Sequence, residues 1–149
     1  MAELIRPAPF GRRLAAATYD LMLLISLWFA VALIGVAVQG GEALSTGSRL
    51  FQGSLLGIAL VFNVWFWTHG GQTLDMRAWR LQLRKEGGGA VSVGRASWRF
   101  MVAVLAWSAG GIGVLWALLH PENKTWQDLL SGTETMLVPA PEPDRKDPQ

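Results

Sequence analysis

An aspartate, Asp20, interrupts an apolar run at residues 14–38 that follows two arginines, Arg12 and Arg13. At about 1.5 Å per helical residue the run is roughly 37 Å long, which exceeds the ~30 Å hydrocarbon core of a bilayer. A charged carboxylate without a partner is costly in that core, so such groups usually face another helix, an aqueous cavity or a counter-ion. Asp20 is therefore a candidate transport-site residue, and a contact that assembles helices is the alternative.

Two other side chains are expected to lie near Asp20. Arg13 falls on the same helical face about two turns away, so a neighbouring helix or a water could bridge the two groups. Asn63 lies close to the end of a second apolar run, at residues 50–68, at a depth similar to that of Asp20. We expect Asn63 to donate a hydrogen bond to Asp20, because neither polar group faces lipid without a cost. Burial and Arg13 act in opposite directions on the protonation of Asp20, which leaves its charge state open.

The composition predicts one integral membrane domain. Of the 149 residues, 51% are hydrophobic and 16% are charged, which is too apolar for an ordinary small soluble domain. Basic residues gather before the first apolar run and between residues 77 and 99. That pattern orients membrane helices and does not indicate nucleic-acid binding. The N-terminus and residues 69–99 should face the cytoplasm of a multi-pass protein in the cell membrane, and the connection at 39–49 should face outside.

A third apolar run, at residues 100–119, has enough residues to span a bilayer but is interrupted by Gly110, Gly111 and Gly113. A straight helix would carry the C-terminus to the outside. A break at the glycines would form two half-helices and return the chain to the cytoplasm, which is allowed where protein shields the backbone. The sequence leaves both topologies open.

A short cytoplasmic β-hairpin is predicted between the second and third apolar runs. Residues 79–84 alternate in polarity, a glycine triplet follows, and residues 90–93 favour strand. One turn of helix is expected just before it, at residues 73–78. The predicted fold class is an all-α integral membrane protein with three hydrophobic helical segments, the third of which the glycines would break, and this small hairpin.

The C-terminal part carries a helix-start signal at Thr125 with an acidic residue, Asp128, at the fourth position. Gly132 is placed to end that short helix, and residues 133–138 then favour an extended conformation. Residues 139–149 lack apolar content and are expected to form a disordered tail. The domain is thus expected to cover residues 9–138.

Enzyme chemistry is not expected. The chain has no cysteine, and no metalloprotease, phosphate-loop or serine-hydrolase motif is present. His69 and His120 each follow an apolar run, where a helix-end role is more common than metal binding. We therefore expect no catalytic residue, no cofactor and no metal site.

Four ordered motifs give the chain a resemblance to the RDD family of membrane proteins. They occupy residues 11–20, 70–74, 92–96 and 125–133. The family is named for one arginine and two aspartates, which Arg13, Asp20 and Asp128 match. The resemblance also implies that Asp128 belongs with Arg13. The chain departs from the family pattern at Asp75, where glycine is common, and at Gln127, where histidine is common.

The resemblance implies a role in transport without specifying a solute. In this interpretation Arg13, Asp20, Asp128 and Asn63 form a polar site in the membrane. Three segments enclose little volume, so a pathway would require a homo-oligomer or a partner membrane protein in the lipid bilayer. The alternative is a structural or accessory subunit of a membrane complex that does not transport.

Overall fold

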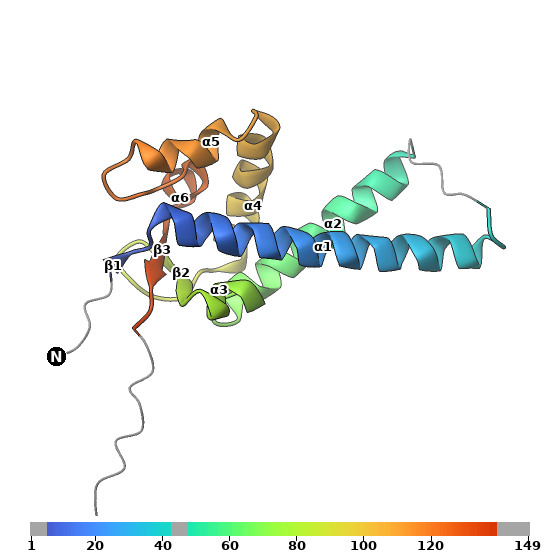
Figure 1. Ribbon diagram of the computed structural model, residues 1–149, viewed down its shortest axis with the longest axis horizontal. Coiled ribbons are helices and arrows are strands. Elements are labelled where there is room, and N and C mark those ends of the chain that lie inside the picture. Colours follow the sequence, from blue (N-terminus) through green and yellow to red (C-terminus); the bar gives the residue numbers. More distant parts are fainter. Residues whose placement is uncertain (1–5, 43–47, 140–149) are drawn as a thin grey trace, which may run out of the picture.

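The computed structural model describes residues 6–42 and 48–139 of the chain. A long helix, α1, runs along the molecule, and α2 crosses it at an angle, while the remaining elements gather around the N-terminal half of α1 (Figure 1). In chain order the elements are β1 (Arg6–Pro7), α1 (Phe10–Val38), α2 (Arg49–Thr68), α3 (Leu74–Ala78), β2 (Leu81–Lys85), α4 (Val93–Ser108), α5 (Ile112–Leu115), the 3-10 helix η1 (Trp116–Leu118), α6 (Trp126–Ser131) and β3 (Thr133–Leu137).

The first two apolar runs form α1 and α2, as their length and composition predict. Both helices are long and apolar enough to cross a membrane, and only 6% of the most apolar stretch of each is buried inside the protein. They touch where Trp28 Nε1 donates to the carbonyl of Leu55 at 3.0 Å. Such outward-facing apolar helices are typical of a chain that is solvated by lipid.

The predicted β-hairpin is wrong. β2 does not pair with residues 90–93 but with β3, and β1 pairs with the other side of β3, so that a three-stranded antiparallel sheet has the order β1-β3-β2. The chain turns back at the glycine triplet, as expected, and Lys85 N donates to the carbonyl of Gly89 at 3.1 Å. Beyond it, however, the Ser92 hydroxyl accepts a hydrogen bond from Arg95 N and caps α4. Helix capping therefore overrides the strand preference of these residues.

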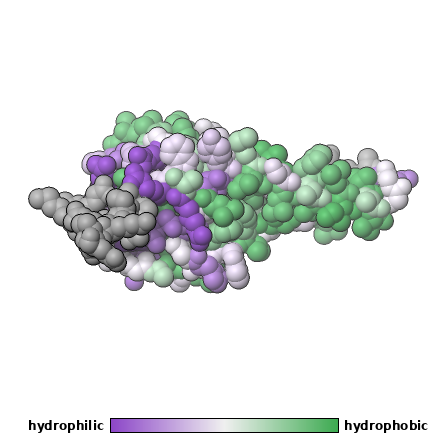
Figure 2. Space-filling view, turned by 60° about the horizontal axis from the view of Figure 1, so that its bottom comes forward, coloured by the Kyte–Doolittle hydropathy of each residue, from purple (hydrophilic) through white to green (hydrophobic). Residues whose placement is uncertain are grey.

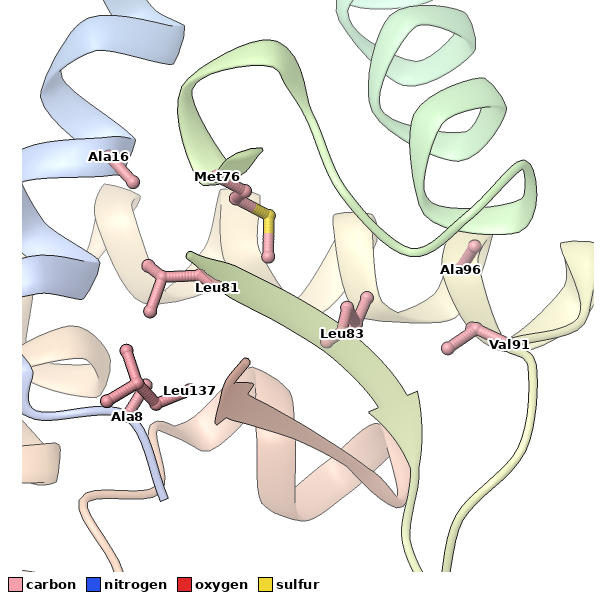
Figure 3. Close-up of a cluster of buried hydrophobic side chains, with 8 residues drawn as sticks. All are labelled: Ala8, Ala16, Met76, Leu81, Leu83, Val91, Ala96 and Leu137. Atoms are coloured by element: carbon pink, nitrogen blue, oxygen red, sulfur yellow. The ribbon is translucent and has the colours of Figure 1, made fainter. Parts of the chain in front are cut away.

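A small hydrophobic core joins the sheet to the helices. Leu81 and Leu83 alternate along β2 and are fully buried, as the strand pattern at residues 79–84 predicts. Figure 3 shows them facing side chains from other parts of the chain. The whole cluster consists of Ala8, Ala16, Met76, Leu81, Leu83, Val91, Ala96 and Leu137. These residues come from α1, α3, β2, α4, β3 and adjoining segments, so the core ties the first and last elements of the described chain together.

The third apolar run is broken at its glycines, in agreement with one of the two predicted topologies. α4 ends at Ser108, Gly110 and Gly111 adopt positive φ angles of 72° and 80°, and the helical segment beyond them turns by 107°. α4 also begins at Val93, before the predicted run, and therefore includes two arginines, Arg95 and Arg99.

The two short helices form where local signals predict them. Thr73 caps α3 by accepting a hydrogen bond from Met76 N. Thr125 and Asp128 form a reciprocal capping box at the start of α6, and Gly132 ends that helix with a left-handed φ of 60°. β3 follows at once. The predicted tail lies outside the described residues, apart from its first position.

Candidate functional site

Asp128 is the centre of a buried ionic network that joins three helices. Its side chain is completely buried, and it pairs through Oδ2 with Arg13 of α1 and through Oδ1 with Arg99 of α4. The Arg99 Nη1 to Oδ1 distance is 2.5 Å. One carboxylate thus holds two guanidinium groups that lie far away in the sequence.

The capping box of α6 orients the Asp128 carboxylate. Both the backbone N–H and the hydroxyl of Thr125 donate to Asp128 Oδ2 at 2.9 Å. Arg13 also donates to the backbone carbonyl of Asn123, just before this cap. Every carboxylate oxygen of Asp128 therefore has charged or polar partners, which is the condition under which a buried charge is tolerated.

Arg99 has partners on two sides besides Asp128. Its Nη1 donates to Thr133 Oγ1 at 2.6 Å, at the start of β3, and its guanidinium lies 5.3 Å from the ring centre of Trp67 on α2. A guanidinium over an indole face is an attractive cation–π arrangement. The network therefore reaches from α1 and α2 to the C-terminal helix and strand.

Asp128 is ionised at neutral pH. Burial alone would raise its pKa, but the charges of Arg99 and Arg13, together with the Thr125 N–H hydrogen bond, outweigh it and lower the pKa of Asp128 to about 2. The pairing energy consequently favours the folded state whenever the carboxylate is charged.

The lowered pKa of Asp128 predicts acid sensitivity. Because the folded pKa lies below the ordinary value of 3.8, the contribution of the network is fully present above about pH 4. It is lost as the pH falls toward 2, by at most about 1.4 kcal/mol for each pH unit. Thermal unfolding in detergent between pH 6 and pH 2 measures this loss. The wild type should lose more stability over that interval than Asp128→Asn, and equal losses would contradict the assignment.

Asp20 belongs to a second, separate polar cluster. Its Oδ2 accepts a hydrogen bond of 2.8 Å from the hydroxyl of Thr73, the buried cap of α3. The carboxyl group of Asp75, in the first turn of α3, lies close enough to Asp20 to interact with it. Asp20 Oδ1 and Asp75 Oδ2 are both buried, and neither accepts a hydrogen bond from the described residues. This arrangement can accept a proton or a small cation between two carboxylates.

The structure therefore divides the residues that sequence reasoning groups together. Arg13 pairs with Asp128, as the family resemblance implies, and not with Asp20. Asn63 donates to the carbonyl of Ala59 in its own helix at 2.9 Å, so the expected hydrogen bond from Asn63 to Asp20 is not formed. Thr73 takes that place, because α3 packs on α1.

Sequence reasoning missed Arg99 and Thr73, and it named Asp75 only as a departure from the family pattern. Arg99 falls among the basic residues that the sequence analysis assigns to membrane orientation, although its position directly before an apolar run is a signal that could have identified it. Thr73 could have been identified as a helix-capping residue, because it lies within residues 70–74, one of the four motifs that carry the family resemblance.

A comparison with protein families identifies the chain independently of this geometry. The family model described as the RDD family matches residues 7–132, which contain the charged residues of both clusters. The chain belongs to the RDD family. No curated protein and no solved structure matches it. In this RDD protein the arginine and the second aspartate of the family pattern form one buried pair, and the first aspartate lies with Thr73 and Asp75.

Proposed function

We propose that this RDD-family membrane protein is a subunit of a transport module in the cell membrane. In this proposal α1 and α2 cross the bilayer, and Asp20 with Thr73 and Asp75 forms the site that binds a proton or a small cation in transit. The buried Arg13–Asp128–Arg99 network is the framework that holds the cytoplasmic end of the helices.

Two buried carboxylate oxygens carry the proposal: Asp20 Oδ1 and Asp75 Oδ2 have no hydrogen-bond donor among the described residues. Buried polar atoms normally have partners, and two carboxylates side by side repel unless a proton or cation is shared between them. In Asp128, by contrast, each carboxylate oxygen is paired with an arginine.

The position of Asp20 supports a site at the cytoplasmic edge of the membrane. Residues 21–38 of α1 carry no charged side chain and are about 27 Å long, close to the hydrocarbon thickness. Thr73, the partner of Asp20, lies shortly after the end of α2 at Thr68. A carboxyl group at this level can exchange with cytoplasmic water and still face the helical bundle.

A pathway needs more helices than one chain supplies. Asp20 lies on a helix whose apolar stretch is almost entirely uncovered by its own chain, and a polar route must be screened from lipid. We therefore propose that several copies, or this chain with a partner membrane protein, enclose the route.

The test is flux through the purified protein reconstituted in liposomes that contain a dye selective for protons, sodium or potassium, matched in each case to the imposed gradient of that ion. Asp20→Asn and Asp75→Asn should each lower the flux at least tenfold relative to wild type. Glu122→Gln, which neutralises an exposed carboxylate, is the matched control and should leave the flux unchanged. Equal flux in wild type and Asp20→Asn, or wild-type flux no higher than in protein-free liposomes, would refute the transport proposal.

The second candidate is an accessory subunit that does not transport. The observation that favours it is the uncovered apolar surface of α1 and α2, which a partner's helices could cover. Native mass spectrometry of the detergent-extracted protein discriminates between the two. A partner of fixed stoichiometry together with absent flux would favour the accessory role.

A further inference from the structure

We infer that α4, α5 and η1 do not cross the membrane but are seated in a single leaflet, on the side that holds the sheet, so that the described chain crosses only twice. This inference rests on the proposed insertion of α1 and α2. In this arrangement the outward apolar face of α4 contacts lipid acyl chains. Both ends of the described chain lie on the same side of the membrane.

The sheet determines whether the chain crosses the membrane an even or an odd number of times between β1 and β3. β1 precedes α1, β2 follows α2, and β3 follows η1, yet all three strands are hydrogen-bonded in one sheet. Strands in one sheet must lie on the same side of a membrane, because lipid-exposed sheet edges are not tolerated in the hydrocarbon core. The chain therefore makes an even number of crossings between β1 and β3. α1 and α2 already provide two.

Side-chain contacts join the same three regions independently of the sheet. Arg13, at the start of α1, is bound to Asp128 after η1. Lys124, also after η1, pairs with Glu86 after β2 at 2.5 Å. A third full crossing would have to separate these partners by the thickness of the bilayer and leave buried charges unpaired.

The dimensions of the third apolar segment also exclude a span. α4 has 16 residues and is about 24 Å long, which is shorter than the ~30 Å hydrocarbon core. The helical segment after it turns by 107° and therefore adds little to the distance crossed. The first two turns of α4 carry Arg95 and Arg99, and Arg95 binds the carbonyls of Ser131 and Gly132 at the end of α6.

α4 nevertheless presents an apolar stripe away from the protein. Trp98, Met101 and Leu105 recur at helical spacing and are 55%, 48% and 67% exposed. The opposite face is buried and includes Phe100 and Ala106. Three leucines beyond the break, at residues 115, 118 and 119, are also more than half exposed.

Figure 2 shows hydrophobic surface over α1 and α2 where they extend beyond the rest of the protein. A further hydrophobic area lies at the other end of the molecule, where the sheet and the shorter helices gather. In the proposed arrangement α1 and α2 anchor the sheet and the shorter helices at a bilayer. Lipid of that bilayer is therefore always within reach of the exposed apolar face of α4. Exposed apolar surface of this kind is typical of a face that contacts a membrane.

The chain contains no cysteine, so single cysteines report topology without background. We choose three exposed positions in full-length protein: Gln39 at the end of α1, Ala90 after β2, and Glu122 after η1. Sealed membrane vesicles are treated with a membrane-impermeant maleimide, before and after permeabilisation. Ala90→Cys and Glu122→Cys should be labelled from the same side, and Gln39→Cys from the other side.

The outcomes separate the inference from the proposed function. Labelling of Ala90→Cys and Glu122→Cys from opposite sides overturns the inference and leaves the two spans intact. Labelling of Gln39→Cys and Ala90→Cys from the same side overturns the two spans themselves and the inference with them. The comparison of Gln39→Cys with Ala90→Cys therefore tests the membrane setting on which the transport proposal rests.

A second measurement tests the leaflet contact directly. A spin label at Leu105→Cys should collide more often with oxygen, which concentrates in lipid, than with a water-soluble nickel complex. A label at Glu122→Cys serves as the aqueous control with the reverse preference. Preferential collision of the Leu105→Cys label with the nickel complex would overturn the assignment of this face to lipid.

Discussion

Replacing Asp128 with asparagine should lower the free energy of unfolding by about 3–5 kcal/mol, the usual cost of removing one partner from a buried ion pair. The substitution is nearly isosteric and keeps an oxygen that can cap α6. It removes the negative charge from between Arg13 and Arg99, both of which are largely buried. Two guanidinium groups would then lie together without a counter-charge, and their repulsion and desolvation would favour unfolding.

Equilibrium unfolding in mixed micelles, followed by far-ultraviolet circular dichroism, measures this change. Glu122→Gln removes an exposed ion pair with Lys124 and serves as the matched loss of one carboxylate. Its stability should equal that of the wild type, because exposed pairs contribute little. A loss in Asp128→Asn no larger than in the control would show that the network does not hold the fold.

Gly71→Ala should be the most damaging glycine substitution, at about 3 kcal/mol from a left-handed backbone and a steric clash together. Gly71 has a φ of +70°, and a Cβ at this position would lie 2.3 Å from the backbone carbonyl oxygen of Leu83. That contact cannot be relieved by a rotamer change, because Leu83 N donates to the Gly71 carbonyl at 2.7 Å and holds the two backbone segments together. β2 would have to move away from the chain that follows α2.

Gly87→Ala separates the conformational cost of a left-handed backbone from the cost of the steric clash. Gly87 has a similar φ of +82°, but no atom of the described residues lies within 4 Å of the position that a Cβ would take. It should therefore show only the conformational cost of about 1–2 kcal/mol. The same unfolding assay applies to both variants. If Gly71→Ala were no less stable than Gly87→Ala, the close approach between Gly71 and β2 would be refuted.

The parts of the fold that local signals determine could be predicted from the sequence. Continuous apolar length predicts α1 and α2, and the capping residue Thr125 predicts the start of α6. The glycines at 110 and 111 predict the break after α4, because they can take the positive φ angles that the turn requires. In each of these cases the deciding interactions lie within a few residues along the chain.

The parts that depend on distant partners could not be predicted in the same way. β2 has the alternation of a strand, but its partner, β3, lies about 50 residues further along and no local pattern identifies it. Local reasoning therefore pairs β2 with the nearest strand-prone segment, which is wrong. Arg13 and Asp128 are 115 positions apart, and only the family resemblance links them.

Asp20 illustrates how an argument from the distance to a helix end fails when one helix packs into a folded domain. Asn63 is expected beside it because both residues lie near those ends of the apolar runs that the sequence predicts to face the cytoplasm. The first turns of α1 instead pack against α3 and the sheet, so Asp20 meets Thr73 in the segment after α2. Equal distance from a helix end does not give equal depth when one helix extends into a folded domain.

Arg13 and Asp128 form one structural unit while Asp20 belongs to another, and double-mutant cycles on the free energy of unfolding test this division most directly. Arg13→Gln with Asp128→Asn should show a coupling energy of about 0.5–3 kcal/mol, and Asp20→Asn with Asp128→Asn should be additive within about 0.5 kcal/mol. Additivity in the first cycle with strong coupling in the second would contradict the division of the family's three charged residues into two clusters.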